Sequence, residues 1–219
     1  MPSSKDAIVA TLTQSFTSGR KSEKPYPHWI VDNCLPADVV AEVLTLPFPA
    51  PALGGISGKR EVHNATRRYF DAENMDKHPV CDAVNAALQD KRVTDCIEKT
   101  FSTKLGGTYL RVEFAQDTDG FWLEPHTDLG VKSFTFLLYL STEAQHADLG
   151  TDIYDNDKKH VGRSPFKSNG AMIFVPGGNT YHGFEARKIE AVRKSLVINF
   201  VTNDWRAREQ LAYPSTPIA

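Results

Sequence analysis

The sequence predicts an α+β fold in which helices come first and β-strands follow. Up to about residue 101, apolar residues recur three or four positions apart, which is typical of helices that pack on a core. Beyond Gly106 the chain changes to short β-rich runs separated by turn clusters, the pattern of an antiparallel sandwich or jelly roll. Because the two kinds of element do not alternate along the chain, we expect the helices to pack on one side of a β core.

The helical half contains two clear segments. Pro36 and Asp38 suit a first helical turn, an apolar stripe follows over residues 39–44, and Pro47 ends the pattern. Residues 77–101 return to helical spacing, with a break within them. The stretch 47–59 between these segments is rich in Gly and Pro, and we expect a surface loop there.

The chain divides into a main domain and two flanking segments. Residues 1–24 are interpreted as an N-terminal tail or a short helix, because Ile8, Leu12 and Phe16 are spaced four apart. Within this region and just after it, residues 18–27 have the composition of a linker. The main domain is expected over residues 25–205, and residues 206–219 are expected to be a C-terminal tail.

The β half begins after Gly106, although His28–Asp32 also has the composition of a strand. Turn clusters such as Asp117–Gly120 and Pro176–Asn179 separate most of the later runs. The predicted strands are 108–115, 120–124, 133–141, 151–154, 171–175, 180–184 and 194–202.

Composition limits the classes of function. The 219 residues are 41% hydrophobic and 24% charged, as expected for one soluble globular domain. A net charge of −2 gives no general reason to bind nucleic acid, which we therefore consider unlikely, or an anionic membrane. The three cysteines lack CxxC spacing, and no segment has the length and apolar character of a membrane span. These features favour a cytoplasmic location and leave the oligomeric state unknown.

The segment Glu124-Pro125-His126-Thr127-Asp128 carries the strongest chemical signal. His126 and Asp128 are two residues apart, so on an extended segment their side chains leave the same face. His182 lies in a later predicted strand and supplies the third ligand. Two imidazoles and one carboxylate leave half of the positions of an octahedral metal open, an arrangement suited to an Fe(II) ion that binds an organic acid and O2.

Arg193 follows His182 by eleven residues and is the predicted binding group for a carboxylate. A guanidinium holds a planar carboxylate with two parallel charge-assisted hydrogen bonds, which a lysine cannot do. Ser195 is two residues further along the same predicted strand, so it faces the same side.

Over residues 27–202, the order of these motifs resembles the Fe(II)/2-oxoglutarate-dependent dioxygenases, specifically the prolyl-hydroxylase-like branch. The resemblance rests on Pro125–Asp128, the strand Phe134–Ser141, the segment Ser168–Phe174, His182, and Arg193 with Ser195. It implies a double-stranded β-helix (jelly roll) core with N-terminal helices packed against it. It also implies Fe(II) bound by His126, Asp128 and His182, and 2-oxoglutarate bound by Arg193 and Ser195, with Tyr139 and Thr135 as further contacts.

The same resemblance implies a hydroxylase that consumes O2 and 2-oxoglutarate and releases succinate and CO2. A small molecule such as an amino acid is the first expected substrate, and a prolyl-type residue of a protein is the alternative. Arg68, Trp122 and Tyr154 are the expected substrate contacts. From a different class, a non-catalytic jelly-roll module that binds a metal or ligand also remains open, as does a metal-dependent isomerase.

Overall fold

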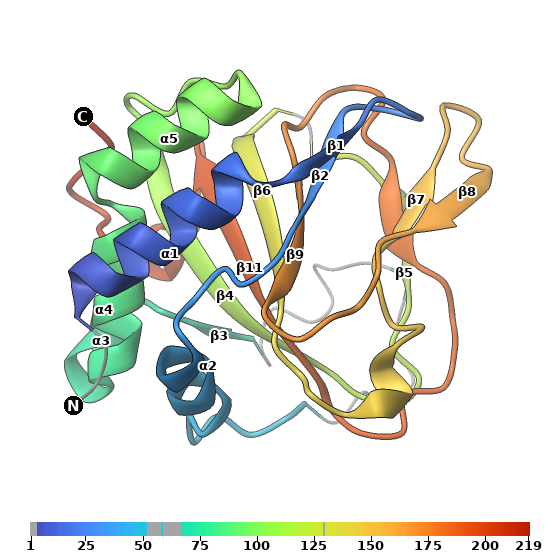
Figure 1. Ribbon diagram of the computed structural model, residues 1–219, viewed down its shortest axis with the longest axis horizontal. Helices are drawn as coiled ribbons and strands as arrows, with labels where there is room; N and C mark the ends of the chain where they lie inside the picture. The colour runs from blue at the N-terminus through green and yellow to red at the C-terminus, as the bar shows by residue number, and fades with distance from the viewer. Residues whose placement is uncertain (1–3, 52–57, 59–66, 129) are drawn as a thin grey trace.

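The computed structural model describes residues 4–51, 58, 67–128 and 130–219. Its β-strands form two antiparallel sheets, and the helices lie on the side of the larger sheet that faces away from the smaller one (Figure 1). This mixed arrangement of helices and antiparallel sheets confirms the predicted α+β class.

The larger sheet has seven strands in the order β1-β2-β9-β6-β11-β4-β3 among the described residues. Its centre is β11, which pairs along its length with both β4 and β6. The strands in spatial order are β1 (Arg20–Ser22), β2 (His28–Val31), β9 (Gly170–Phe174), β6 (Lys132–Tyr139), β11 (Arg193–Val201), β4 (Tyr109–Asp117) and β3 (Arg68–Tyr69).

In the part of the chain that the structure describes, the smaller sheet has four strands in the order β5-β10-β7-β8. These strands are short, and β5 and β10 carry the two histidines of interest at their ends. The strands are β5 (Leu123–His126), β10 (His182–Phe184), β7 (Asp152–Tyr154) and β8 (His160–Arg163).

Helices cover one face of the larger sheet and form the main core with it. Alternate residues of β11 point in opposite directions, so Leu196, Ile198 and Phe200 enter this core, while Arg193 and Ser195 face the smaller sheet. The helices are α1 (Lys5–Thr17), α2 (Ala37–Leu44), α3 (Ala72–Lys77), α4 (Pro79–Leu88) and α5 (Lys91–Phe101).

Both flanking segments contribute to this core. Of the two alternatives for the N-terminal region, the structure has the helix, and Ile8, Leu12 and Phe16 are buried. At the other end, the Ile218 N–H donates to the carbonyl of Thr108 at 2.8 Å, and the Ile218 side chain is buried. Residues before 25 and after 205 therefore pack together with the segment between them.

The sequence did not predict several short elements. Residues 18–27 were interpreted as a linker, but Arg20–Ser22 forms β1, which pairs with β2. All three residues of β1 are exposed, so backbone bonds alone define the strand and no apolar alternation marks it. The strands β3 and β8 and the helix α3 were missed as well. Most of the predicted loop 47–59 lies outside the described residues.

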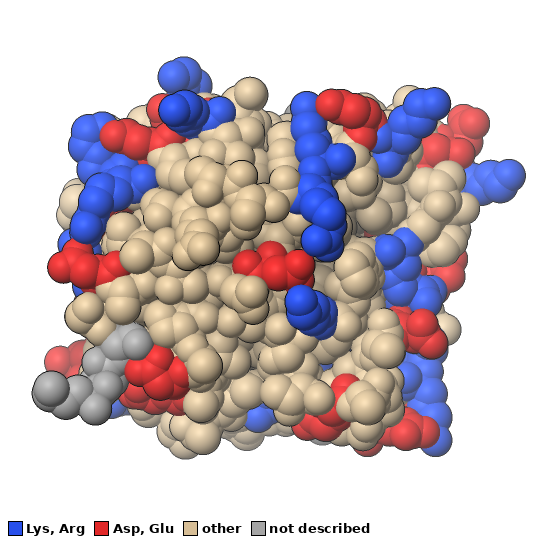
Figure 2. Space-filling view, in the orientation of Figure 1, with Lys and Arg blue, Asp and Glu red and all other residues tan. Residues whose placement is uncertain are grey.

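The charges show no concentration of one sign on the face in Figure 2, where Lys and Arg side chains lie among Asp and Glu. Among the described residues, no helix combines the length and apolar character needed to cross a membrane.

The position of α1 leads to a prediction about stability. Phe16 is fully buried and makes edge contacts with Phe101 and Phe136, each with ring centroids 5.5 Å apart. Phe16→Ala removes these contacts and leaves a cavity, so we expect it to lower the free energy of unfolding by about 3–5 kcal/mol. Gln14→Ala, on the exposed side of the same helix, should change it by less than about 0.5 kcal/mol. Chemical denaturation measures both, and equal effects would show that α1 does not belong to the core.

Candidate metal centre

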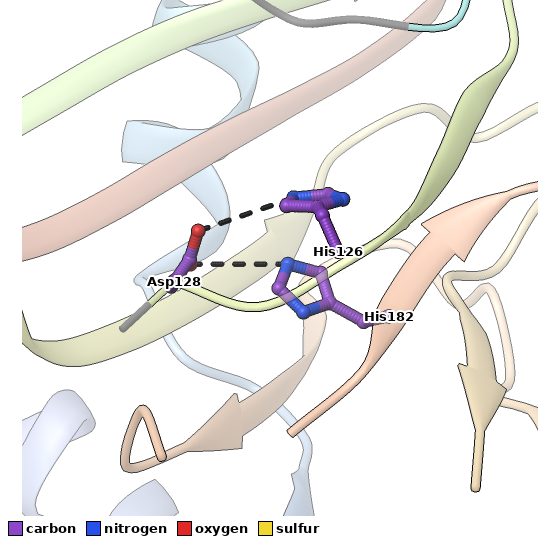
Figure 3. Close-up of side chains that lie close together, drawn as sticks. All are labelled: His126, Asp128 and His182. Atoms are coloured by element: carbon purple, nitrogen blue, oxygen red, sulfur yellow. Dashed lines mark ion pairs between the residues drawn. The ribbon is translucent and has the colours of Figure 1, made fainter. Parts of the chain in front are cut away.

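His126, Asp128 and His182 lie together between the two sheets (Figure 3). His126 ends β5 and is the direct cross-strand partner of His182, which begins β10. Their ring centroids are 4.3 Å apart. Asp128 reaches the same point from two residues beyond β5, with its oxygens 4.0 Å from His126 Nε2 and 3.8 Å from His182 Nε2. The three potential ligand atoms all lie within 4.8 Å of one another.

Both imidazoles are held by the backbone in the tautomer that a metal requires. His126 Nδ1 lies 2.8 Å from the carbonyl of Glu124, and His182 Nδ1 lies 3.0 Å from the carbonyl of Thr180. A carbonyl oxygen only accepts hydrogen bonds, so in the neutral ring each Nδ1 carries the proton and the lone pair is on Nε2. Such bonds orient metal-binding histidines and increase their basicity.

Asp128 is buried and is held through both oxygens. Lys132 Nζ contacts Oδ1 at 2.7 Å, and the Thr135 hydroxyl donates to Oδ2 at 2.9 Å. Burial by itself raises the pKa of Asp128, but the electrostatic effects of Lys132 and of the neighbouring His182 lower it by a larger amount. The pKa of Asp128 is therefore well below the ordinary value. Asp128 is therefore an ionised carboxylate at neutral pH.

His182 has the opposite protonation tendency. Burial lowers its pKa to about 3, and the nearby Asp128 carboxylate only partly opposes this effect. The site therefore combines a neutral, buried imidazole with an ionised carboxylate. Neutral imidazole and carboxylate are the forms that coordinate a divalent metal, so the residues fit the ion predicted from the sequence.

A second group of potential ligands, Asp152, His160 and Glu185, has a different character. Both oxygens of Asp152 are bound by arginines, Arg163 Nε at 2.6 Å and Arg187 Nη1 at 2.7 Å. Two guanidinium groups already neutralise this carboxylate, so the cluster links β7 and β8 to the segment after β10 and does not resemble a metal centre.

One pocket connects the candidate metal ligands with the predicted carboxylate-binding residues. Its walls include His126, Asp128 and His182 on one side, and Arg193 and Ser195 on β11 on the other. Apolar side chains from both sheets complete it, namely Leu123, Phe121, Phe184, Leu137 and Val197. The structure thus brings together residues that lie up to 82 positions apart in the sequence, from Ala115 to Val197.

Arg193 is a buried residue of this pocket lining and is held by three kinds of contact. Its Nε donates to the carbonyl of Leu149 at 2.7 Å, and its Nη1 donates to the Asp117 carboxylate. The guanidinium also lies 4.9 Å from the ring centroid of Phe184 and 5.6 Å from that of Tyr139. These contacts fix the orientation of the guanidinium within the pocket.

The two further predicted co-substrate contacts are placed differently from each other. Tyr139 lines the pocket, and its hydroxyl is hydrogen-bonded to Thr151 at 2.8 Å and to Ser164 at 2.6 Å. Thr135 is fully buried and donates its hydroxyl to Asp128. In this structure Thr135 therefore holds the carboxylate of Asp128, and its predicted contact with a co-substrate stays a prediction.

The predicted substrate contacts do not line the part of the pocket that the structure describes. Arg68 borders a separate groove with Phe48 and His78, and Trp122 is 39% exposed beside Gly58. Tyr154 is buried, with its ring 5.6 Å from that of His160. The structure does not bring these residues to the metal ligands, and their role in substrate binding stays a prediction.

Two charged residues of the pocket, Lys132 and Asp117, were not predicted from the sequence. Lys132 had a local signal, since it follows Asp128 by four residues and begins the next strand. Asp117 was assigned to a turn, but it is the last residue of β4 and the cross-strand partner of Arg193. Only the register of two distant strands reveals that contact. His146 is also fully buried, and its Nε2 lies 2.9 Å from the carbonyl of Ala191.

Comparison with solved structures identifies the fold. A prolyl 4-hydroxylase from Phytophthora capsici aligns with a TM-score of 0.60 and 13% identity over 94% of this chain and 68% of that chain. A prolyl hydroxylase from Trichoplax adhaerens, solved with a hypoxia inducible factor peptide fragment, gives 0.56 and 15% over 93% of each chain. An oxidoreductase of the 2OG-Fe(II) oxygenase family from Burkholderia pseudomallei gives 0.54 and 13%, over 91% of this chain and 90% of that one.

The chain therefore has the fold of the 2OG-Fe(II) oxygenases, and its structural neighbours include proteins of the prolyl-hydroxylase branch. This confirms the resemblance predicted from the order of the motifs. No protein-family model matches the sequence, and comparison with curated protein sequences gives no match.

The protonation of His182 predicts how the stability of the metal-free protein depends on pH. Its pKa is about 3 in the folded state, against 6.5 for a free imidazole, so between these values the unfolded chain binds a proton that the folded protein does not. Stability is therefore lost as the pH falls from 6.5 towards 3. Between pH 7.5 and 4.5 we expect this residue to contribute a loss of roughly 2–3 kcal/mol.

Urea denaturation of metal-free protein at the two pH values measures this loss. His182→Asn removes the titrating group, so its loss should be smaller than that of the wild type. An equal loss in both proteins would contradict the buried neutral state of His182.

The hydrogen bond between Thr135 and Asp128 predicts an effect on metal affinity. Thr135→Val keeps the shape but removes the donor to Asp128 Oδ2, so the carboxylate is oriented less firmly. We expect metal affinity to fall about 10–100-fold, as measured by competition for Co(II) with a chromogenic chelator. Thr103→Val is the matched control, because the Thr103 hydroxyl donates to a backbone carbonyl, that of Ser133. If Thr135→Val binds metal as tightly as the control, Thr135 does not position the ligand.

Proposed function

We propose that the protein is an Fe(II)- and 2-oxoglutarate-dependent hydroxylase. The observation that carries this proposal is the single pocket whose lining contains both the His126, Asp128 and His182 cluster and the buried Arg193. A simple metal-binding module does not need a guanidinium in the same pocket as its ligands. The fold shared with 2OG-Fe(II) oxygenases supports the proposal. We also interpret the two antiparallel sheets as the two halves of a double-stranded β-helix, or jelly roll.

In this proposal, the residues of the chain bind and orient the reactants. His126 and His182 present Nε2, and Asp128 presents a carboxylate that Lys132 and Thr135 hold in place. A bound Fe(II) supplies the O2 chemistry that converts 2-oxoglutarate to succinate and CO2 and oxidises a substrate C–H bond. The arrangement leaves coordination positions for the co-substrate and O2, because the described residues offer three ligands in this cluster.

Arg193 is assigned to the far carboxylate of 2-oxoglutarate, with Ser195 beside it on the same face of β11. Phe121, Leu123 and Phe184 give this pocket apolar walls, which exclude water and strengthen the interaction between opposite charges. Tyr139 stands next to Arg193 as an aromatic wall.

The first substrate class that we propose is a small molecule such as an amino acid. Among the described residues, every helix and strand belongs to the two sheets or to the layer that covers them, and none forms a separate recognition module. A prolyl-type residue of a protein is the second candidate. It is favoured by two of the structural neighbours, which are prolyl hydroxylases, one of them solved with a peptide fragment.

Titration under anaerobic conditions tests the co-substrate chemistry. Addition of Fe(II) and then 2-oxoglutarate to the metal-free protein should produce the weak visible charge-transfer band of the chelate. His126→Ala should abolish the band and the formation of succinate in air, because it removes a ligand. Iron binding without this band at saturating 2-oxoglutarate would favour a binding module or an isomerase, and release of succinate stimulated by amino acids or by prolyl peptides would identify the substrate class.

Arg193→Lys tests the assigned carboxylate contact. The lysine keeps a positive charge beside Asp117 but loses the planar pair of donors, so we expect the KM for 2-oxoglutarate to rise about tenfold while kcat changes less. Lys194→Ala is the control, because Lys194 Nζ donates to the carbonyl of Leu44, outside the pocket lining. Steady-state assays of succinate release measure both variants, and an unchanged KM in Arg193→Lys would remove Arg193 from the co-substrate site.

A further inference from the structure

Asp117 places a second carboxylate at the position where a co-substrate carboxylate is expected. Asp117 ends β4 and is the direct cross-strand partner of Arg193 in β11. Both residues are buried and both line the pocket. Asp117 Oδ2 accepts a hydrogen bond from Arg193 Nη1, so the protein itself supplies an anion to this guanidinium.

The remaining contacts of Arg193 strengthen the electrostatic interaction between Arg193 and Asp117. Arg193 Nε is already bound to the carbonyl of Leu149, and the rings of Phe184, Phe166 and Tyr139 surround the guanidinium, with centroids 4.9–5.6 Å away. Charges in such surroundings interact more strongly than they do in water. Asp117 therefore cancels much of the positive charge that Arg193 offers to a ligand.

Among the described residues that line the pocket, the other cation does not compensate. Lys132 also lines it, but its ammonium group is 2.7 Å from Asp128 Oδ1 at the metal ligands. A ligand with a carboxylate at its far end would approach Arg193 beside Asp117, and two carboxylates that share one cation repel each other. An uncharged end would meet an ion pair that is already satisfied and would not suffer this repulsion.

We infer that Asp117 is a specificity-determining residue of the co-substrate site, and that it weakens the preference for 2-oxo acids with a far carboxylate over those with an uncharged end. This inference rests on the proposed function. On this inference, the ligands of the pocket are 2-oxo acids as a class. The pocket binds 2-oxoglutarate less tightly than it would if Arg193 had no carboxylate beside it.

The experiment compares two ligands of equal chain length, 2-oxoglutarate and 2-oxopentanoate, whose far end carries no charge. Both are titrated anaerobically into Fe(II)-loaded protein, and the dissociation constants are read from the charge-transfer band of each chelate. In the wild type we expect 2-oxopentanoate to bind no more than about tenfold more weakly than 2-oxoglutarate. In Asp117→Asn this ratio should increase at least about tenfold, mainly because 2-oxoglutarate binds more tightly, since a charge-assisted pair is no longer opposed.

Asp119→Asn is the control for net charge, because Asp119 is exposed and lies two residues away on the same segment. It should leave the ratio unchanged. Asp117→Ala is the second variant and should shift the ratio in the same direction as Asp117→Asn. Thermal denaturation verifies that each variant is folded.

The outcomes separate this inference from the function on which it depends. A ratio that is the same in wild type and in both folded Asp117 variants overturns the inference and leaves the proposed function intact. Absence of the band with both ligands in all proteins overturns both. An increased ratio confined to the Asp117 variants supports the inference, and a structural role alone would not change the discrimination between two ligands.

Discussion

The candidate site depends on the register of β11 between β4 and β6. This strand pairs Arg193 with Asp117, Ser195 with both Ala115 and Tyr139, and Asn199 with Thr135. A shift by one residue would turn Arg193 and Ser195 into the apolar core and bring Leu196 into the pocket, because side chains alternate between the two faces of a sheet. The apolar residues on the other face prevent such a shift, since they are buried against the helices.

The same register builds a chain of buried hydrogen bonds behind the candidate metal ligands. Thr135 donates to Asp128, and Asn199 Nδ2 donates to Thr135 at 3.1 Å. Arg111 Nη1 then donates to Asn199 at 3.2 Å, and Arg111 also pairs with Glu113 at 2.9 Å. The larger sheet thus has an apolar face that stabilises the fold and a polar face that orients Asp128, and one set of strands serves both purposes.

Local patterns predicted the parts of this molecule that are determined locally. The spacing of two residues between His126 and Asp128 predicted that they lie together, and they do. The long apolar runs around residues 133–141 and 194–202 correspond to β6 and β11. Strands as short and exposed as β1 and β8 leave no such pattern, because their backbone bonds, and not their side chains, define them. Periodicity alone cannot distinguish them from turns.

Contacts between distant segments are the part of the site that the sequence could not predict. Arg193 was identified from its position after His182, but its partner Asp117 is 76 residues away and resembled a turn residue. Thr135 was expected to contact a co-substrate, and its bond to Asp128 depends on how β6 begins relative to the loop before it. Candidate ligands can be predicted from a sequence, whereas the residues that orient those ligands can be identified only from the three-dimensional structure.

The polar face of the larger sheet has a consequence for how this sequence can change over evolution. Arg111 and Glu113 are both almost fully buried and form an ion pair, and Glu113 also pairs with Arg67 at 3.1 Å. Loss of Glu113 alone would leave the charge of Arg111 uncompensated in the interior, which is far more costly than replacing both together by apolar residues. A substitution at Glu113 is therefore expected to be accompanied by one at Arg111 in related chains. The polar face of the larger sheet should accordingly vary in correlated steps.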